Sequence, residues 1–307
     1  MQQSKIENSP LPISQPNGFP GLPSGWITEQ ENYSCSTGAH SIGALLFRRE
    51  NWSNSRALVI LHGMGEHGGR YLHVPHFLQS QVSAVFCPDK QGHGRSTGVR
   101  GHVRNFDDLA DDAALAVRRL HERLMKQFGT SEIHVLGHSL GGHVAIRMAR
   151  KYPDLPIRSL TVSAPFLGLR DVPAVKKAAA LALSRVWGSL PLDTGLAVEK
   201  LSRDPAVVKH YSDDPMNHGK MTPRFFRELL AAFDDTMNNR AGLHVPLLIL
   251  LPTGDQVVNG EKTTLFFHAL EHRDKLLKTY PGFFHESLNE LGKEQVFADI
   301  AAWIQSH

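Results

Sequence analysis

The chain has 307 residues, of which 41% are hydrophobic and 21% are charged, and its formal net charge is +3. These values are typical of a globular protein, and so small a net charge gives no indication of nucleic-acid binding. No apolar run approaches the roughly 20 residues that would span a bilayer, and residues 1–15 lack the basic and apolar segments of a secretory signal. With only two cysteines, we expect reduced thiols, no metal site and a cytoplasmic location.

The first 25 residues contain five prolines and three glycines. Such a stretch buries little surface, so we expect residues 1–25 to form a mobile leader. Residues 33–47 are β-prone and are broken by Thr37-Gly38, which indicates a hairpin at the edge of a sheet. Residues 56–61 read as a buried strand.

A glycine-rich loop, His-Gly-Met-Gly-Glu-His-Gly-Gly-Arg-Tyr at residues 62–71, directly follows this strand. Its glycine density indicates that the backbone approaches another group closely. We interpret it as a loop that presents backbone N–H groups to an anion, rather than as a flexible connection. The N–H of Met64 is the candidate donor.

Residues 71–79 look helical, and residues 83–88 read as the next strand. Asp89 follows at the end of that strand, where catalytic acids occur. In a glycine-rich turn, however, an aspartate more often accepts hydrogen bonds from neighbouring backbone N–H groups. We therefore favour a structural role for Asp89.

A long amphipathic helix is expected over residues 106–128. Four acids near its N-terminal end complement the helix dipole, and we expect them to face solvent rather than to bind a metal. They are Asp107, Asp108, Asp111 and Asp112.

The stretch that organises the chain is an apolar run at residues 133–136 followed by Gly137-His138-Ser139-Leu140-Gly141. A strand, a sharp turn with serine at its tip and a helix form the arrangement called a nucleophile elbow. The glycines remove β-carbons that would block the turn. The helix that follows would point its N-terminus at developing negative charge. We interpret Ser139 as a nucleophile rather than as part of an ordinary turn.

After a strand at residues 160–164, the alternation of strands and helices stops until about residue 241. Residues 172–187 are almost wholly apolar, and a second helix is expected over residues 223–233. We interpret residues 169–241 as a helical cap inserted over the elbow. The apolar segment would roof an apolar pocket, touch a lipid surface or be buried against the core.

The alternation resumes with strands at residues 246–251 and 275–280, each followed by a polar residue, Asp255 and His285. Repeated strand–helix units predict a mostly parallel sheet with helices on both faces. Functional residues of such sheets gather beyond the carboxyl ends of the strands. Ser139, Asp255 and His285 occupy such positions in the order expected for a catalytic triad of this fold.

The chain resembles α/β-hydrolases of the monoacylglycerol lipase and lysophospholipase group, which is similar to the S33 serine aminopeptidases. The resemblance extends from about Tyr33 to Trp303, so residues 26–168 and 242–307 would form the hydrolase core. It depends on five segments: residues 62–71, 89–96, 137–142, 254–258 and 280–286.

The resemblance implies a triad of Ser139, Asp255 and His285. It also implies that the backbone N–H groups of Met64 and Leu140 form the oxyanion hole. The family requires no cofactor or metal.

The resemblance further places Glu66 and Arg70 near the polar end of the substrate, although a purely structural ion pair fits them equally well. Some members carry a second histidine three residues after the catalytic one, where this chain has Leu288.

We therefore expect a carboxylic-ester hydrolase that cleaves a single-chain lipid ester, monoacylglycerol first and lysophospholipid second. General esterase activity and cleavage of amides stay open, as does a lipid-binding protein with negligible turnover. We expect Phe166, Leu167 and Trp187 to contact the substrate, and peripheral contact between the cap and a membrane.

Overall fold

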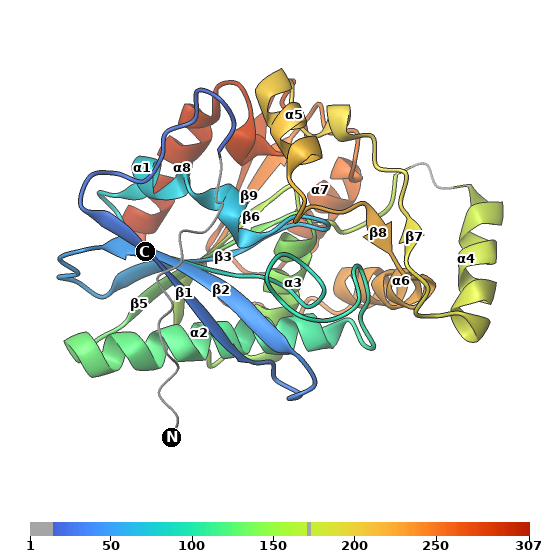
Figure 1. Cartoon of the computed structure of the whole chain (residues 1–307), viewed down its shortest axis with the longest axis horizontal. Coiled ribbons are helices and arrows are strands. Elements are labelled where there is room, and N and C mark those ends of the chain that lie inside the picture. Colours follow the sequence, from blue (N-terminus) through green and yellow to red (C-terminus); the bar gives the residue numbers. More distant parts are fainter. Residues whose placement is uncertain (1–14, 171–172) are drawn as a thin grey trace.

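The computed structural model describes residues 15–170 and 173–307. Eight strands form the central sheet, in the order β1 (Trp26–Ser34), β2 (Ser41–Arg49), β4 (Ala84–Pro88), β3 (Arg56–Leu61), β5 (Glu132–His138), β6 (Ile157–Ser163), β9 (Leu247–Pro252) and β10 (Lys275–Tyr280) (Figure 1). β2 pairs antiparallel with both β1 and β4. The remaining neighbours pair in parallel. The expected mostly parallel sheet with an antiparallel hairpin at one edge is confirmed.

Helices cover both faces of this sheet. They are α1 (Val74–Leu78), α2 (Asp107–Phe128), α3 (Leu140–Lys151), α7 (Gly260–Ala269) and α8 (Lys293–Ser306), with short 3-10 turns η1 (Gly68–Tyr71) and η3 (Ser287–Asn289). Successive residues of a strand point to opposite faces. In β3, Ala57, Val59 and Leu61 belong to the hydrophobic cluster that holds α2, α3 and α7. Leu58 and Ile60 belong to the cluster that holds α1 and α8.

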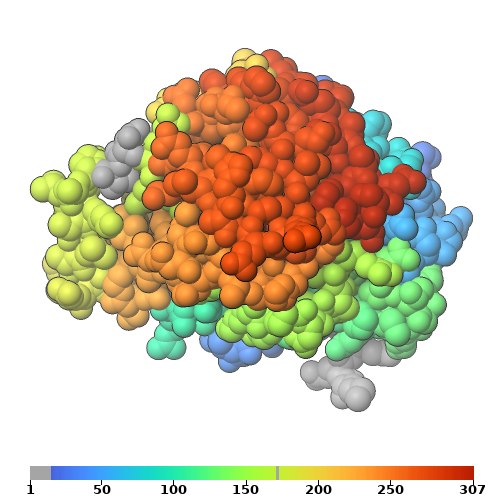
Figure 2. Space-filling view, turned by 180° about the vertical axis from the view of Figure 1, so that it is seen from behind, coloured from blue at the N-terminus to red at the C-terminus, as the bar shows by residue number. Residues whose placement is uncertain are grey.

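The chain leaves the sheet between β6 and β9, and we call residues 169–241 the cap segment. Its elements are α4 (Ala174–Val186), β7 (Leu192–Asp193), η2 (Val198–Lys200), α5 (Pro205–Asp213), β8 (Lys220–Met221) and α6 (Pro223–Asn238). β7 and β8 form a small antiparallel pair separate from the central sheet. The space-filling view shows yellow-green α4 at one edge of the molecule (Figure 2).

The two long helices of the cap segment are packed differently. α6 begins at the Thr222 cap, whose hydroxyl accepts the Phe225 N–H at 3.2 Å, and it places Phe225, Leu229 and Phe233 in the main hydrophobic cluster. In α4, by contrast, Ser184 is the buried residue, and the apolar side chains are largely exposed. Burial of this apolar helix against the core, one of the three alternatives for residues 172–187, is therefore wrong for its described part. Residues 171 and 172 lie outside the described residues.

The end of the expected leader packs against the core. The Phe19 ring lies edge-on to His73 at a centroid distance of 5.1 Å, and the Lys293 ammonium lies 4.0 Å from the centre of the Phe19 ring. Residues 1–14, the rest of the expected leader, lie outside the described residues. None of the helices described is both long and apolar enough to cross a membrane.

Candidate active site

The sharp turn between β5 and α3 carries Ser139. Its φ of 53° is one that side-chain-bearing residues rarely adopt. The turn depends on glycine, because a Cβ at Gly137 would lie 2.5 Å from the Gly141 carbonyl oxygen and 2.7 Å from the Gly142 Cα. A Cβ at Gly141 would overlap the Leu61 carbonyl group. The strand–turn–helix arrangement expected around Ser139 is confirmed.

Three loops that follow three parallel strands bring Ser139, Asp255 and His285 together. His285 Nε2 lies 2.9 Å from Ser139 Oγ, and His285 Nδ1 lies 2.8 Å from Asp255 Oδ2. The other Asp255 oxygen accepts the N–H groups of Val257 at 2.7 Å and Val258 at 3.1 Å. The carboxylate thus holds the imidazole with Nδ1 as donor, which leaves Nε2 to accept the serine proton.

Asp255 and His285 shift each other's pKa in opposite directions. Burial by itself would lower the pKa of His285, but the hydrogen-bonded Asp255 carboxylate raises that pKa above its ordinary value. Burial would raise the pKa of Asp255, but His285 and the two backbone N–H groups lower it. The arrangement therefore has an ionised aspartate that strengthens the histidine as a base.

The two expected oxyanion donors belong to the residue that follows Ser139 and to the loop after β3. Leu140 is the first residue of α3, so its N–H has no intrahelical acceptor. Met64 lies in the loop after β3 and lines the same cavity as Ser139. Within the described part of the chain, neither N–H has a hydrogen-bond acceptor. Both groups are thus available to a ligand.

A cavity of about 540 Å³ lies between the sheet and the cap segment, with Ser139 and His285 in its wall. Its volume is in the range of small-molecule sites. Apolar side chains of both parts supply much of the remaining wall, including Met64, Phe166, Ala180, Leu196, Met221 and Phe226.

The remaining expected contact residues lie in different places. Phe166 and Glu66 line the cavity. Arg70 is buried in ion pairs with Glu66 and Glu286, and it is not part of the cavity wall. Leu167 is buried in the main hydrophobic cluster, and Trp187 is exposed at the end of α4, so neither lines the cavity.

Sequence reasoning missed other residues of this site. Glu286 and Tyr211 line the cavity together with the apolar side chains of the second half of the cap segment. Glu286 could have been predicted as a site residue from the sequence, because it directly follows His285. No such signal existed for Tyr211, which lies in a helix far from every motif.

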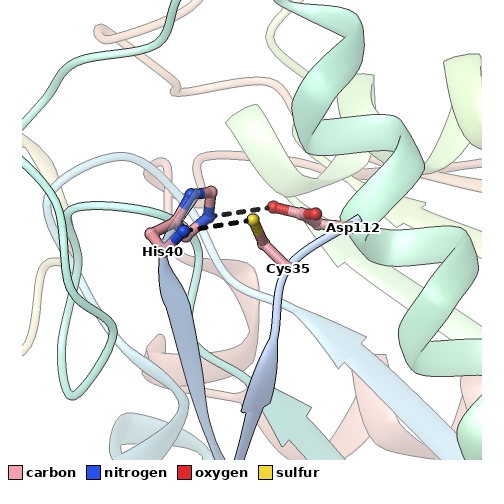
Figure 3. A group of neighbouring side chains, drawn as sticks. All are labelled: Cys35, His40 and Asp112. Atoms are coloured by element: carbon pink, nitrogen blue, oxygen red, sulfur yellow. Dashed lines mark hydrogen bonds and ion pairs between the residues drawn. The ribbon is translucent and has the colours of Figure 1, made fainter. Parts of the chain in front are cut away.

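One group of side chains in the described part of the chain is close enough to hold a metal ion, namely Cys35, His40 and Asp112 (Figure 3). Each of them already has protein partners. Asp112 accepts the Ser36 N–H at 2.8 Å and the Ser36 hydroxyl at 2.6 Å, and its other oxygen lies 3.2 Å from His40 Nε2. Cys35 Sγ accepts the His40 N–H at 3.4 Å. The group therefore has a structural role, because these hydrogen bonds hold the β1–β2 turn against α2.

The solvent-facing position expected for the acids of α2 is therefore wrong for Asp112, which is buried. Asp107 and Asp111 are also engaged, in ion pairs with Arg147 and Lys151 of α3. Asp89 has the structural role that we favoured, because it accepts the Gly68 N–H at 2.6 Å and the Arg95 N–H at 2.8 Å.

Comparison with known proteins places this geometry in a family. A family model described as serine aminopeptidase, S33, matches residues 53–292. Over 258 residues the chain is 33% identical to a monoacylglycerol lipase of Mycolicibacterium smegmatis, covering 83% of this chain and 90% of that protein. It is 30% identical to the phospholipase YtpA of Bacillus subtilis over 254 residues, covering 81% and 95%.

The fold agrees with these matches. The crystal structure of a monoacylglycerol lipase from Paleococcus ferrophilus is similar with a TM-score of 0.71 at 29% identity, covering 82% of this chain and 94% of that one. The family resemblance expected from the sequence motifs is confirmed. The chain belongs to the serine aminopeptidase S33 family and is a serine hydrolase of the α/β-hydrolase superfamily, in the group that includes monoacylglycerol lipases.

Proposed function

We propose that this hydrolase cleaves single-chain lipid esters, with monoacylglycerol as its preferred substrate. One observation carries the proposal: the Ser139 hydroxyl, hydrogen-bonded to His285, lies in the wall of a cavity lined largely by apolar side chains. An acyl chain would lie along the apolar wall, with its ester carbonyl at Ser139. The relatives named as a monoacylglycerol lipase and a phospholipase support a lipid ester as substrate.

In the first half of the reaction, Ser139 Oγ attacks the ester carbonyl carbon while His285 Nε2 takes the serine proton. The carbonyl oxygen becomes an oxyanion, which the N–H groups of Met64 and Leu140 stabilise. The imidazolium formed on His285 is stabilised by Asp255. Protonation of the leaving alkoxide by His285 then releases glycerol and leaves an acyl-enzyme.

In the second half, His285 takes a proton from water, and the resulting hydroxide attacks the acyl carbon. A second oxyanion forms at the same two N–H groups. When it collapses, Ser139 recovers its proton from His285 and the fatty acid leaves. Since each step moves only a proton or an acyl group, the cycle requires no cofactor.

The cavity wall carries charges of both signs, because Arg170 and Lys176 line it as well, but the charged groups nearest Ser139 on the oxyanion-loop side are carboxylates. Glu66 and Glu286 both line the cavity, whereas Arg70, which lies between them, is outside the cavity wall. A phosphodiester at this end would face two carboxylates that are only partly neutralised by one guanidinium. We therefore rank monoacylglycerol ahead of lysophospholipid.

We further propose that α4 contacts the membrane that supplies the substrate. Its outer surface exposes Val175, Val186 and Trp187, the last with 63% of its surface accessible. Lys176 and Lys177 are exposed on the same helix. An apolar surface flanked by lysines suits the interface of a membrane that contains anionic lipids.

A substrate panel at equal acyl length tests the proposed reaction. It comprises monoacylglycerol, diacylglycerol, lysophosphatidylcholine, a p-nitrophenyl ester and an acyl amide, each with wild type and Ser139→Ala. We expect monoacylglycerol to give the highest kcat/KM and Ser139→Ala to abolish turnover. A lead for lysophosphatidylcholine would overturn the substrate ranking. Binding of lipid with no turnover of any substrate would indicate a lipid-binding protein instead.

Sedimentation with vesicles that contain anionic lipid tests the membrane contact. Trp187→Glu should reduce the bound fraction, whereas Leu265→Glu, a control in α7 with 57% exposure, should not. Equal binding of both variants and wild type would contradict the contact.

A further inference from the structure

A buried ion pair joins the two loops that supply the base and one of the oxyanion donors. Arg70, in the loop after β3, donates to both oxygens of Glu286, with Nη1–Oε1 and Nη2–Oε2 distances of 2.8 Å. Glu286 directly follows His285 in the chain. Both side chains are almost completely buried, with 3% and 4% of their surface exposed. Bidentate pairs of this kind fix relative geometry as well as contributing energy.

On the oxyanion side, Arg70 is tied to the backbone next to Met64 through Glu66. Arg70 Nη1 donates to Glu66 Oε2 at 2.6 Å. The other Glu66 oxygen accepts the Tyr71 hydroxyl at 2.8 Å and the Gly63 N–H. The Gly63 N–H belongs to the peptide unit directly before the one that carries the Met64 N–H, so the Glu66 carboxylate restrains the backbone next to the proposed oxyanion donor.

On the side of the base, Glu286 is held by more than Arg70. The Asn289 side-chain amide donates to Glu286 Oε2 at 2.9 Å, and the Glu286 N–H donates to the Leu201 carbonyl of the cap segment at 2.8 Å. A movement of the loop that carries His285 would therefore disturb the guanidinium and, through it, Glu66.

We propose that Glu286 is a positioning residue. Its pair with Arg70 keeps His285 at a fixed position relative to the loop after β3, which carries the Met64 N–H. The inference rests on the proposed function, because it assigns the pair to the same acyl transfer. Attack at the carbonyl carbon requires the base and the oxyanion donors to be placed correctly at once. They belong to loops about 220 residues apart, and the ion pair spans residues 70 and 286 directly.

The negative charge of Glu286 also raises the pKa of His285. The groups that face the imidazole are Asp255, hydrogen-bonded to it, the His138 ring at a centroid distance of 4.8 Å, and the cluster of Glu66, Arg70 and Glu286. Burial makes His138 neutral at ordinary pH, with a pKa of about 4. Two carboxylates and one guanidinium leave an excess negative charge that favours the imidazolium.

Two variants of Glu286 distinguish its effect on the placement of His285 from the effect of its charge on the pKa of His285. Glu286→Gln removes the charge while keeping the side-chain length, so the acid-side midpoint of the kcat/KM profile should fall by about half a unit to one unit. Glu286→Asp keeps the charge but is one methylene too short for the bidentate pair. It should lower kcat by roughly 10- to 100-fold with little change in KM, and leave the acid-side midpoint unchanged. The substrate for both is p-nitrophenyl butyrate.

Glu290→Gln is the matched control. Glu290 is a completely buried carboxylate of the same segment that pairs with Arg203 at 3.0 Å instead of Arg70. It also accepts the Phe284 N–H at 3.2 Å, so it controls for the charge of Glu286 and not for the placement of the loop. This variant should lose thermal stability while keeping the acid-side midpoint. An equal shift of the midpoint in Glu290→Gln would overturn the specific role of Glu286.

Wild-type kcat and a wild-type midpoint in folded Glu286→Gln and Glu286→Asp would also overturn the proposal. If Glu286→Gln does not fold, kcat of Glu286→Asp decides the positioning role. Failure of the wild type to cleave any ester would refute the proposed function itself. Normal cleavage by wild type and by both Glu286 variants would refute only the positioning role.

Discussion

Replacing Gly137 by alanine would disturb the turn that carries Ser139 without removing a functional side chain. The new Cβ would lie 2.5 Å from the Gly141 carbonyl oxygen, whereas real Cβ atoms stay at least 3.0 Å away. The start of α3 must therefore move by about 0.5 Å relative to the end of β5 to restore that minimum separation. Since the obstacle is backbone, no side-chain rotation relieves it.

The size of this displacement determines the expected losses of stability and of kcat in Gly137→Ala. Overpacking of a tight interior costs about 1–3 kcal/mol of unfolding free energy. A misplacement of 1 Å at a reacting centre costs on the order of 10² in rate, so half that distance should lower kcat roughly tenfold. Urea unfolding measures the first quantity, and steady-state cleavage of p-nitrophenyl butyrate measures the second.

Gly129→Ala is the control for lost stability alone. Gly129 ends α2 with a φ of 71°, and a Cβ there meets nothing within 4 Å. Because alanine disfavours this left-handed backbone conformation, Gly129→Ala should lower the free energy of unfolding by about 1–2 kcal/mol and leave kcat unchanged. If Gly137→Ala retained both wild-type stability and wild-type kcat, the reasoning about the turn would be refuted.

Three further predictions follow from the protonation states. Asp255→Asn should keep the fold but lower kcat about 10⁴-fold, because asparagine does not hold His285 in the required tautomer; a loss below tenfold in steady-state assays would contradict this role. Because the pKa of His285 is raised, and only the neutral imidazole accepts the serine proton, kcat/KM should fall on acidification with a midpoint above the ordinary 6.5; a pH–rate profile with a midpoint below 6.5 would be inconsistent with this base. Burial lowers the pKa of His143, which lies 2.9 Å from Thr236 Oγ1, to about 3. The neutral form therefore stabilises the fold above pH 6.5, and about 2 kcal/mol should be lost by pH 5. Urea unfolding of His143→Gln should show a smaller difference between pH 7 and pH 5, and an undiminished difference would contradict this assignment.

The sequence predicted those parts of the molecule that local chemistry dictates. Short, continuously apolar runs identified the buried strands, and the glycines around Ser139 identified the turn, because a Cβ at Gly137 or Gly141 would overlap neighbouring backbone atoms. Asp255 and His285 were predicted from their places after strands, since parallel strands end at one edge of a sheet.

Parts that depend on tertiary partners were not predictable in this way. Asp112 looked like a solvent-facing acid of a helix, but the distant Ser36 and His40 turn it into a buried acceptor. Leu167 and Trp187 were expected in the site, but Leu167 is buried in the core and Trp187 is exposed on the surface, a difference that the apolar character of a residue does not reveal. The pairing of Arg70 with Glu286 joins segments too far apart for any local pattern.

Trapping the acyl-enzyme on Ser139 tests the central claim most directly. The enzyme is mixed with p-nitrophenyl butyrate, quenched with acid within the first turnover and analysed by intact-mass and peptide mass spectrometry. We predict one butyryl group, located on Ser139 in the wild type and absent from Ser139→Ala. Release of nitrophenol with no adduct on Ser139, or with an adduct on another residue, would contradict the account.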